Sequence, residues 1–149
     1  MLVDSRAPIV RAPVSKAHAP APAENSLLAA LPRKDFELLE DFLEPVKLTF
    51  GEVVYHPGEP IRHVYFPTDS LVSLLTLAEG HQALEVGLVG REGMLGIPLA
   101  LGVSNSPVRA LIQGTGMALR MTAGHFTDEL QLNVLLQRGI TDAQRQRNP

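Results

Sequence analysis

The stretch EVGLVGREGMLG, residues Glu85–Gly96, decides how the rest of this chain is interpreted. Its first half belongs to a strand that we predict over Leu84–Val89, with Glu85 directed toward solvent. Its second half is rich in glycine and predicts a turn that leads into a short helical piece within Glu92–Leu101. A turn of this kind presents backbone N–H groups that suit a phosphate. Three apolar residues alternate along the strand and share one face: Leu84, Val86 and Leu88.

Short apolar runs separated by turn residues lie on both sides of this stretch. Turn signals such as Pro57-Gly58 and Thr68-Asp69-Ser70 separate the runs at short intervals. This spacing is typical of an all-β sandwich or barrel, so the fold class is predicted to be mainly β. The predicted strands are Val46–Phe50, Val53–His56, His63–Phe66, Leu71–Leu77, Leu84–Val89, Val108–Ile112 and Gly116–Met121.

Two short helices are predicted before the first strand. Asn25 or Ser26 can cap the first helix, and Pro32 separates it from a second helix over Asp35–Leu43. Residues 1–23 are rich in alanine and proline and show no apolar periodicity, so we predict a disordered tail there.

The last strand is followed by one predicted amphipathic helix. Thr122 is a suitable N-cap for a helix over Ala123–Arg138, with Gly139 ending the pattern and residues 139–149 forming a polar C-terminal tail. This helix carries two apolar stripes side by side. An apolar surface of that width needs two partners, so the second stripe predicts a homodimer or a partner protein. The first stripe is Phe126, Leu130 and Val134, and the second is Leu132, Leu135 and Leu136.

Composition excludes several classes of protein. The chain has no cysteine, which excludes disulfides, iron–sulfur clusters and cysteine nucleophiles. Its net charge is -3, whereas proteins that bind DNA or RNA usually carry an excess of basic residues. The longest apolar run, Met94–Val103, is shorter than the roughly 20 residues of a membrane span, and the N-terminus lacks the layout of a signal peptide. We therefore predict a cytoplasmic protein without a membrane partner.

Four motifs in this chain resemble the sensor half of Crp/Fnr-type bacterial transcription regulators. The resemblance implies one cyclic-nucleotide-binding-like domain over residues 24–138. It also implies the fold, a jelly-roll-like antiparallel β-roll with short N-terminal helices and one C-terminal helix. The motifs are GEVVYHPGEP at Gly51–Pro60, HVYFP at His63–Pro67, the opening stretch at Glu85–Gly96 and PVRAL at Pro107–Leu111.

The resemblance further implies a ligand pocket, but this chain departs from the family there. Nucleotide-binding members carry a Phe-Gly-Glu-type triplet, whose acid holds the ribose, and an Arg-Ser/Thr-Ala triplet that holds the cyclic phosphate. Leu95-Gly96-Ile97 and Val108-Arg109-Ala110 stand in their place, so the acid is lost and the arginine comes one residue late. Because a one-residue slip reverses the face of a side chain in a strand, we expect no cyclic AMP binding of the usual kind. The candidate pocket residues are Gly93, Met94, Leu95, Gly96, Ile97, Val108, Arg109 and Ala110.

These features predict a non-catalytic, ligand-sensing regulatory domain with another small effector, or none, in place of a cyclic nucleotide. In the family, a ligand in the roll shifts the C-terminal helix and the dimer interface, and this shift changes the orientation of the DNA-binding domains. Residues 139–149 are too few for a helix-turn-helix, so we expect no direct DNA contact from this chain. A free-standing sensor domain and a regulator with an interrupted reading frame both fit this expectation.

Two alternatives stay open. A degenerate roll without a ligand can act as a protein-interaction module that docks through Leu132, Leu135 and Leu136. A cupin-like metalloenzyme needs histidines that project together, and no His-x-His occurs here. No serine lies in a strand–elbow–helix glycine pattern, so we assign no catalytic residue and no metal ligand. The side chains weighed for a metal are His56, Glu59, His63 and His81.

Overall fold

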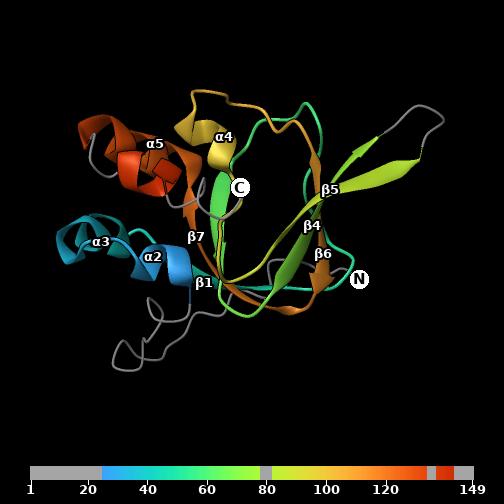
Figure 1. The fold of residues 1–149 in the computed structure, drawn as a ribbon, viewed down its shortest axis with the longest axis horizontal. Coiled ribbons are helices and arrows are strands. Elements are labelled where there is room, and N and C mark those ends of the chain that lie inside the picture. The colour runs from blue at the N-terminus through green and yellow to red at the C-terminus, as the bar shows by residue number, and fades with distance from the viewer. Residues whose placement is uncertain (1–24, 78–81, 134–136, 143–149) are drawn as a thin grey trace.

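A computed structural model describes residues 25–77, 82–133 and 137–142, and it contains two antiparallel sheets with the helices on one side (Figure 1). The predicted tail over residues 1–23 lies outside the described residues. The strands are β1 Glu44–Leu48, β2 Val53–Tyr55, β3 His63–Pro67, β4 Leu71–Leu77, β5 Ala83–Val89, β6 Arg109–Gly114 and β7 Gly116–Thr122. The helices are α2 Ser26–Ala29, α3 Arg33–Glu40, α4 Ile97–Ala100 and α5 Ala123–Leu132. Every predicted strand is present, and the mainly β prediction is confirmed.

The two sheets face each other and form the roll. The first has the strand order β1-β7-β3 and lies beside the helices, and we call it the helix-side sheet. The second has the order β2-β6-β4-β5, and we call it the outer sheet. Tyr55 on β2 and Tyr65 on β3 meet edge to face with ring centroids 6.2 Å apart, so these two side chains point into the roll.

Strands β3 and β7 of the helix-side sheet are buried on both faces because their side chains alternate between two cores. One face packs with the helices, and the other packs inside the roll against the outer sheet. Buried residues on the helix face include Val64, Phe66, Leu119 and Met121, together with Phe126 and Leu130 of α5. Buried residues inside the roll include Val46, Leu48, Tyr65 and Ala118, together with Val72, Ala110 and Ile112 of the outer sheet.

The N-terminal helices differ from their predicted bounds in one case. Asn25 caps α2, as predicted, because its side chain accepts from the Leu28 N–H. The prediction for α3 was wrong at both ends, since the helix begins at Arg33 and ends at Glu40. Pro32 has a φ of -58°, which suits the start of a helix, and its carbonyl accepts from the next turn. The chain leaves the helix early because β1 begins at Glu44.

The C-terminal helix is shorter than predicted. α5 ends at Leu132, and Asn133 has an extended backbone with φ -138° and ψ 96°, so a single helix to Arg138 was wrong. Residues 137–142 are helical again, and Ile140 is fully buried in the same core as Leu31. That burial favours a bend at Asn133, and it corrects the prediction that Gly139 ends the helical pattern. Leu132 is 81% exposed, while Leu135 and Leu136 lie outside the described residues.

The alternation predicted along β5 is interrupted by a bulge. Leu74 pairs with Gly87 and Leu75 pairs with Glu85, so Val86 is an extra residue. The bulge places Glu85 on the outward face with Val86 and Leu88, and its carboxylate accepts from the Ser73 hydroxyl at 3.0 Å. The prediction that Glu85 is directed toward solvent is confirmed, but the prediction that it lies on the face opposite to Val86 was wrong.

Candidate functional site

The candidate cradle is the loop between β5 and α4, and it is tied to the helix-side sheet. Leu95 exchanges two backbone hydrogen bonds with Tyr65 of β3, with N–O distances of 2.8 and 3.1 Å. The Glu92 carboxylate accepts from the Gly90 N–H at 3.1 Å, which makes Glu92 a turn residue. The side chains of Met94 and Leu95 are buried in the two cores. The loop is thus a packed part of the fold.

Gly96 caps α4 at the point where the loop meets the roll. Its φ of 108° lies in the left-handed region, which favours glycine. A Cβ built there would lie 2.6 Å from Val64 Cγ1 and 3.1 Å from the Tyr55 hydroxyl. The backbone at Gly96 therefore packs directly against β3 and β2. Ile97, which stands in place of the family's ribose-binding acid, packs against the core between the helix-side sheet and the helices.

We expect Gly96→Ala to lower the free energy of unfolding by about 2–3 kcal/mol, because the left-handed backbone costs an L-residue about 1–2 kcal/mol and the buried Val64 must move. Gly58→Ala is a matched control, since Gly58 has a φ of 83° but open space around the added Cβ. The control should show the backbone cost alone. Equal losses in urea unfolding would contradict the close approach at Gly96.

The second half of the candidate pocket separates into two faces of the outer sheet. Ala110 is fully buried inside the roll. Arg109 precedes it on β6 and pairs with Leu75, so Arg109 lies on the outward face. The backbone of Val108 is held by the Ser106 hydroxyl at 2.7 Å from its carbonyl oxygen. The structure thus gathers Gly93, Met94, Leu95, Gly96 and Ile97 in one packed segment and places Arg109 away from the roll interior.

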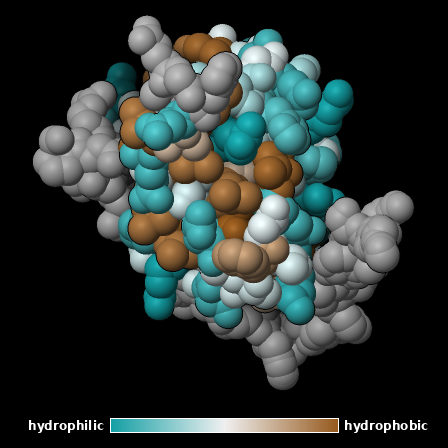
Figure 2. Space-filling model, turned by 90° about the vertical axis from the view of Figure 1, so that its right-hand side faces the viewer, coloured by the Kyte–Doolittle hydropathy of each residue, from teal (hydrophilic) through white to brown (hydrophobic). Residues whose placement is uncertain are grey.

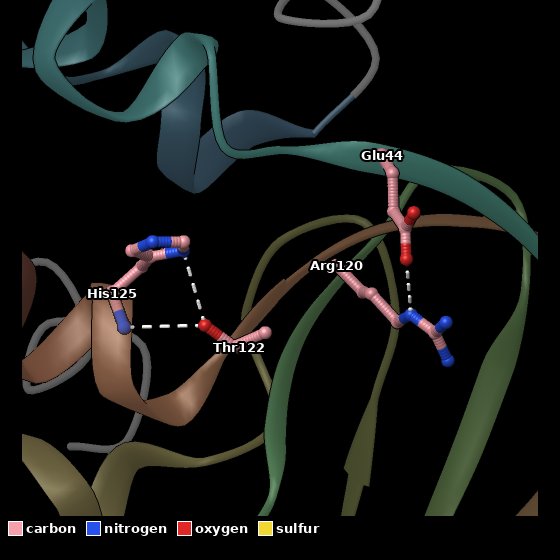
Figure 3. A network of polar contacts seen from close by, with 4 residues as sticks. All are labelled: Glu44, Arg120, Thr122 and His125. Atoms are coloured by element: carbon pink, nitrogen blue, oxygen red, sulfur yellow. Dashed lines mark hydrogen bonds and ion pairs between the residues drawn. The ribbon is translucent and has the colours of Figure 1, made fainter.

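A polar row inside the roll was not found from the sequence. Glu44 of β1, Arg120 of β7 and Tyr65 of β3 are direct cross-strand neighbours, so their side chains share the inward face of the helix-side sheet. Arg120 Nε donates to Glu44 Oε2 at 2.8 Å, as Figure 3 shows, and Arg120 also hydrogen-bonds Tyr65. The Arg120 side chain is 23% exposed. A guanidinium group therefore faces the roll from a position unrelated to Arg109.

Two further polar side chains adjoin this row. The Tyr55 hydroxyl donates to the His63 carbonyl oxygen at 2.7 Å, and the His63 and Tyr65 rings lie 6.2 Å apart. Burial raises the pKa of Tyr55 well above its usual value and also raises the pKa of Tyr65. Burial alone would lower the pKa of Arg120, but its bonds to Glu44 and Tyr65 outweigh that and raise it. The row thus presents neutral phenols around a permanent cation.

Burial lowers the pKa of His63, and the charge of Arg120 adds to the effect. Below the usual histidine value of about 6.5, the unfolded chain therefore binds more protons than the folded chain. We expect stability to fall as the pH drops through about 6.5, and His63→Gln to flatten that part of the profile. Unfolding midpoints in urea between pH 5 and 8 would check this. Parallel profiles for the two proteins would contradict it.

Neither a metal centre nor a membrane span is found in the part of the chain that the structure describes. No three histidine or acidic side chains among the described residues lie close enough to hold an ion. His81, one of the side chains weighed for a metal, lies outside those residues. No described helix is both long and apolar enough to cross a bilayer.

Comparison with known proteins identifies the fold. No family model and no curated protein matches this chain. Among solved structures, the N-terminal domain of a transcriptional regulator from Streptomyces coelicolor is 20% identical, with a TM-score of 0.63 over 83% of this chain and 86% of that one. The sensor domain of the transcriptional regulator DNR from Pseudomonas aeruginosa is 17% identical, with a TM-score of 0.67 and 89% coverage of each chain.

The catabolite activator protein of Thermus thermophilus is 15% identical, with a TM-score of 0.66, and this chain spans 58% of its length. A triple mutant of the regulatory subunit of a cAMP-independent protein kinase A from Trypanosoma brucei, bound to cAMP, is 14% identical, with a TM-score of 0.65 over 81% of this chain and 42% of that one. The chain therefore has the fold of Crp/Fnr-type sensor domains and cyclic-nucleotide-binding domains. This confirms the predicted β-roll and the structural resemblance on which it rested.

Proposed function

We propose that this chain is a non-catalytic sensor domain of a Crp/Fnr-type regulator whose effector is not a cyclic nucleotide bound in the usual way. The fold supports the regulatory class, because the matched solved structures include a transcription regulator's sensor domain. The observation that carries the ligand proposal is the outward position of Arg109 on β6. A cyclic phosphate bound beside β6 would lack the arginine that holds it in the family, which costs about 1.5–3 kcal/mol for each lost bond.

The inward row offers a different place for an effector. Arg120 has five N–H donors and is only partly satisfied by Glu44 and Tyr65 in the hydrogen bonds described above. Arginine in a partly dry setting suits carboxylate and phosphate groups. The proposal is that a small anionic effector reaches Arg120 and competes with Glu44. The neutral phenol of Tyr65 would then supply a hydrogen-bond donor, whereas the Tyr55 hydroxyl already donates to the His63 carbonyl oxygen.

An effector that pairs with Arg120 would act on the helices through β7. Arg120 lies two residues before Thr122, whose side chain caps α5 and contacts His125 (Figure 3). A shift of β7 by a bound effector would move the start of α5, and a bistable packing of the helix core would pass that shift on. The contact of Leu132 with another subunit belongs to the same proposal.

Thermal unfolding of the purified chain tests the proposal. Cyclic AMP, cyclic GMP and cyclic dinucleotides are expected to leave the midpoint unchanged. A true ligand at 100 times its Kd stabilises by about 2.7 kcal/mol, which moves the midpoint by several degrees. A shift of that size with any of these nucleotides would overturn the ligand proposal.

The same assay with a panel of carboxylate and phosphate metabolites tests the positive half of the proposal. Any midpoint rise should disappear in Arg120→Gln and persist in Arg109→Gln, which alters an arginine on the outward face of the other sheet. If the response needed Arg109 and not Arg120, the assigned position of the effector would be wrong.

A further inference from the structure

The outward face of the outer sheet carries an unusual amount of exposed apolar surface. Figure 2 views this side of the molecule and shows apolar side chains gathered over the middle of the face, with polar residues around them. Val86 is 57% exposed and Leu88 is 50% exposed, although both lie in β5. A soluble domain rarely exposes a contiguous apolar patch of this kind without a use for it. We call it the outer face, and its apolar members are the exposed Leu71, Val86 and Leu88 and the half-buried Leu75 and Leu111.

The strand register arranges this face in rows that run across β6, β4 and β5. Leu75 pairs with Arg109 on one side and with Glu85 on the other. The first row therefore reads Arg109, Leu75, Glu85. Ser73, two residues earlier on β4, pairs with Leu111 on one side and with Leu88 on the other, so the second row has a small residue between two leucines.

Each row on one copy is complementary to the same row on a second copy that is related to the first by a two-fold axis along β4. A rotation of 180° about an axis along β4 exchanges β6 with β5 and keeps the level of each row. Arg109 of one copy then lies over Glu85 of the other, and Leu111 lies over Leu88. Leu75 lies near the axis and meets its own counterpart, whereas Ser73 is fully buried and makes no contact across the axis. An interface between identical subunits requires this kind of self-complementarity.

The charges of the first row are available for such a contact. Arg109 forms no ion pair or side-chain hydrogen bond with any residue that the structure describes. Glu85 accepts one hydrogen bond, from the Ser73 hydroxyl, and Ser73 itself is fully buried. That bond holds the Glu85 carboxylate over the face, while the second carboxylate oxygen can accept from an arginine.

We propose that the outer face binds a second copy of this chain about a two-fold axis along β4. The apolar middle supplies the burial, and two Arg109–Glu85 pairs, one on each side, set the register. An unlike partner would have no reason to match opposite charges at equal distances from β4, whereas a second copy does so by symmetry. This interface is independent of the effector proposal and of the predicted contact through Leu132 on α5.

Sedimentation velocity of the full chain over a range of concentrations tests the interface. Glu85→Arg and Arg109→Glu each place like charges opposite one another, and each is expected to raise the dimer Kd about 10-fold or more. The double variant restores opposite charges and should return the Kd to within about 3-fold of the parent. Leu132→Asp tests the separate helix contact: it should remove any association through α5 and leave the dimer held by the outer face intact.

Three results would overturn the proposal: a monomer at every concentration up to about 0.5 mM, a dimer that ignores both charge reversals, or a dimer that only Leu132→Asp dissociates.

A cross-linking experiment keeps the proposal testable if a charge-reversal variant fails to fold. The chain has no cysteine, so single cysteines can be introduced without background. Leu75→Cys lies near the proposed axis and should be joined to its counterpart by a short bis-maleimide, because packed sheets lie about 10 Å apart. Lys47→Cys on β1, an exposed position in the other sheet, is the control and should not be cross-linked. Equal cross-linking of both variants, or of Lys47→Cys alone, would rule out the interface.

Discussion

Phe66→Ala is expected to lower the free energy of unfolding by about 3–5 kcal/mol, the cost of removing a buried aromatic ring from a packed core. Phe66 lies on β3, is fully buried and belongs to the core between the helix-side sheet and the helices. The cavity would open where β3 meets the helices, and the secondary structure around it cannot collapse to fill it. Since whole domains are stable by only about 5–15 kcal/mol, this variant would be close to unfolding.

Urea unfolding at constant temperature measures this loss, provided that the slope with denaturant stays the same. Phe50→Ala is the matched control, because Phe50 is 66% exposed at a turn, and it should change stability by no more than about 0.5 kcal/mol. A loss below about 1 kcal/mol for Phe66→Ala would mean that this core is not packed as described.

Asn25→Ala is expected to cost about 3–4 kcal/mol, although a single polar side chain is removed. Asn25 is fully buried, and its amide donates to the carbonyl oxygens of Pro67 at 2.7 Å and Gly93 at 3.1 Å. Its oxygen accepts from the Leu28 N–H at 3.0 Å as the cap of α2. The cap is worth about 1 kcal/mol, and each buried carbonyl that loses its donor costs about 1–3 kcal/mol. Asn25 therefore joins α2, the end of β3 and the loop before α4.

Two variants separate these contributions in the same unfolding assay. Asn25→Ser keeps a capping oxygen and should recover about 1 kcal/mol of the loss. Asn105→Ala removes an exposed amide that donates to Gly58, and its cost should stay near 0.5 kcal/mol. Similar losses of unfolding free energy for Asn25→Ala and Asn105→Ala would show that the buried hydrogen bonds of Asn25 stabilise the fold no more than an exposed one does.

The strands and turns were predictable because their signals are local. β4 has its predicted bounds, and β5 and β7 differ from theirs by one residue, since alternation and flanking glycines are read within a few positions. The helix ends were less predictable. α5 stops at Leu132 because a distant residue, Ile140, gains burial in the core of Leu31, and no pattern near Asn133 signals that gain.

The candidate site shows the same division. The triplet Val108-Arg109-Ala110 indicated an arginine displaced by one residue, and the pairing of β6 with β4 places Arg109 on the outward face. The partners of Arg120 could not be predicted, because Glu44 is 76 positions away in the chain and meets Arg120 only through the pairing of β1 with β7. The rows of the outer face likewise arise from register and from the bulge beside Val86.

The sequence by itself determined the mainly β class and the order and approximate bounds of the strands. It also determined the departure from the residues that bind nucleotides in the family that the chain resembles. Each of these depends on neighbouring residues, whose spacing directly sets the backbone conformation and the face of a side chain. The tertiary structure alone decided which arginine faces the roll, where α5 ends and which apolar side chains stay exposed. These depend on contacts between segments far apart in the chain, where the free energy of burial and charge pairing outweighs local preference.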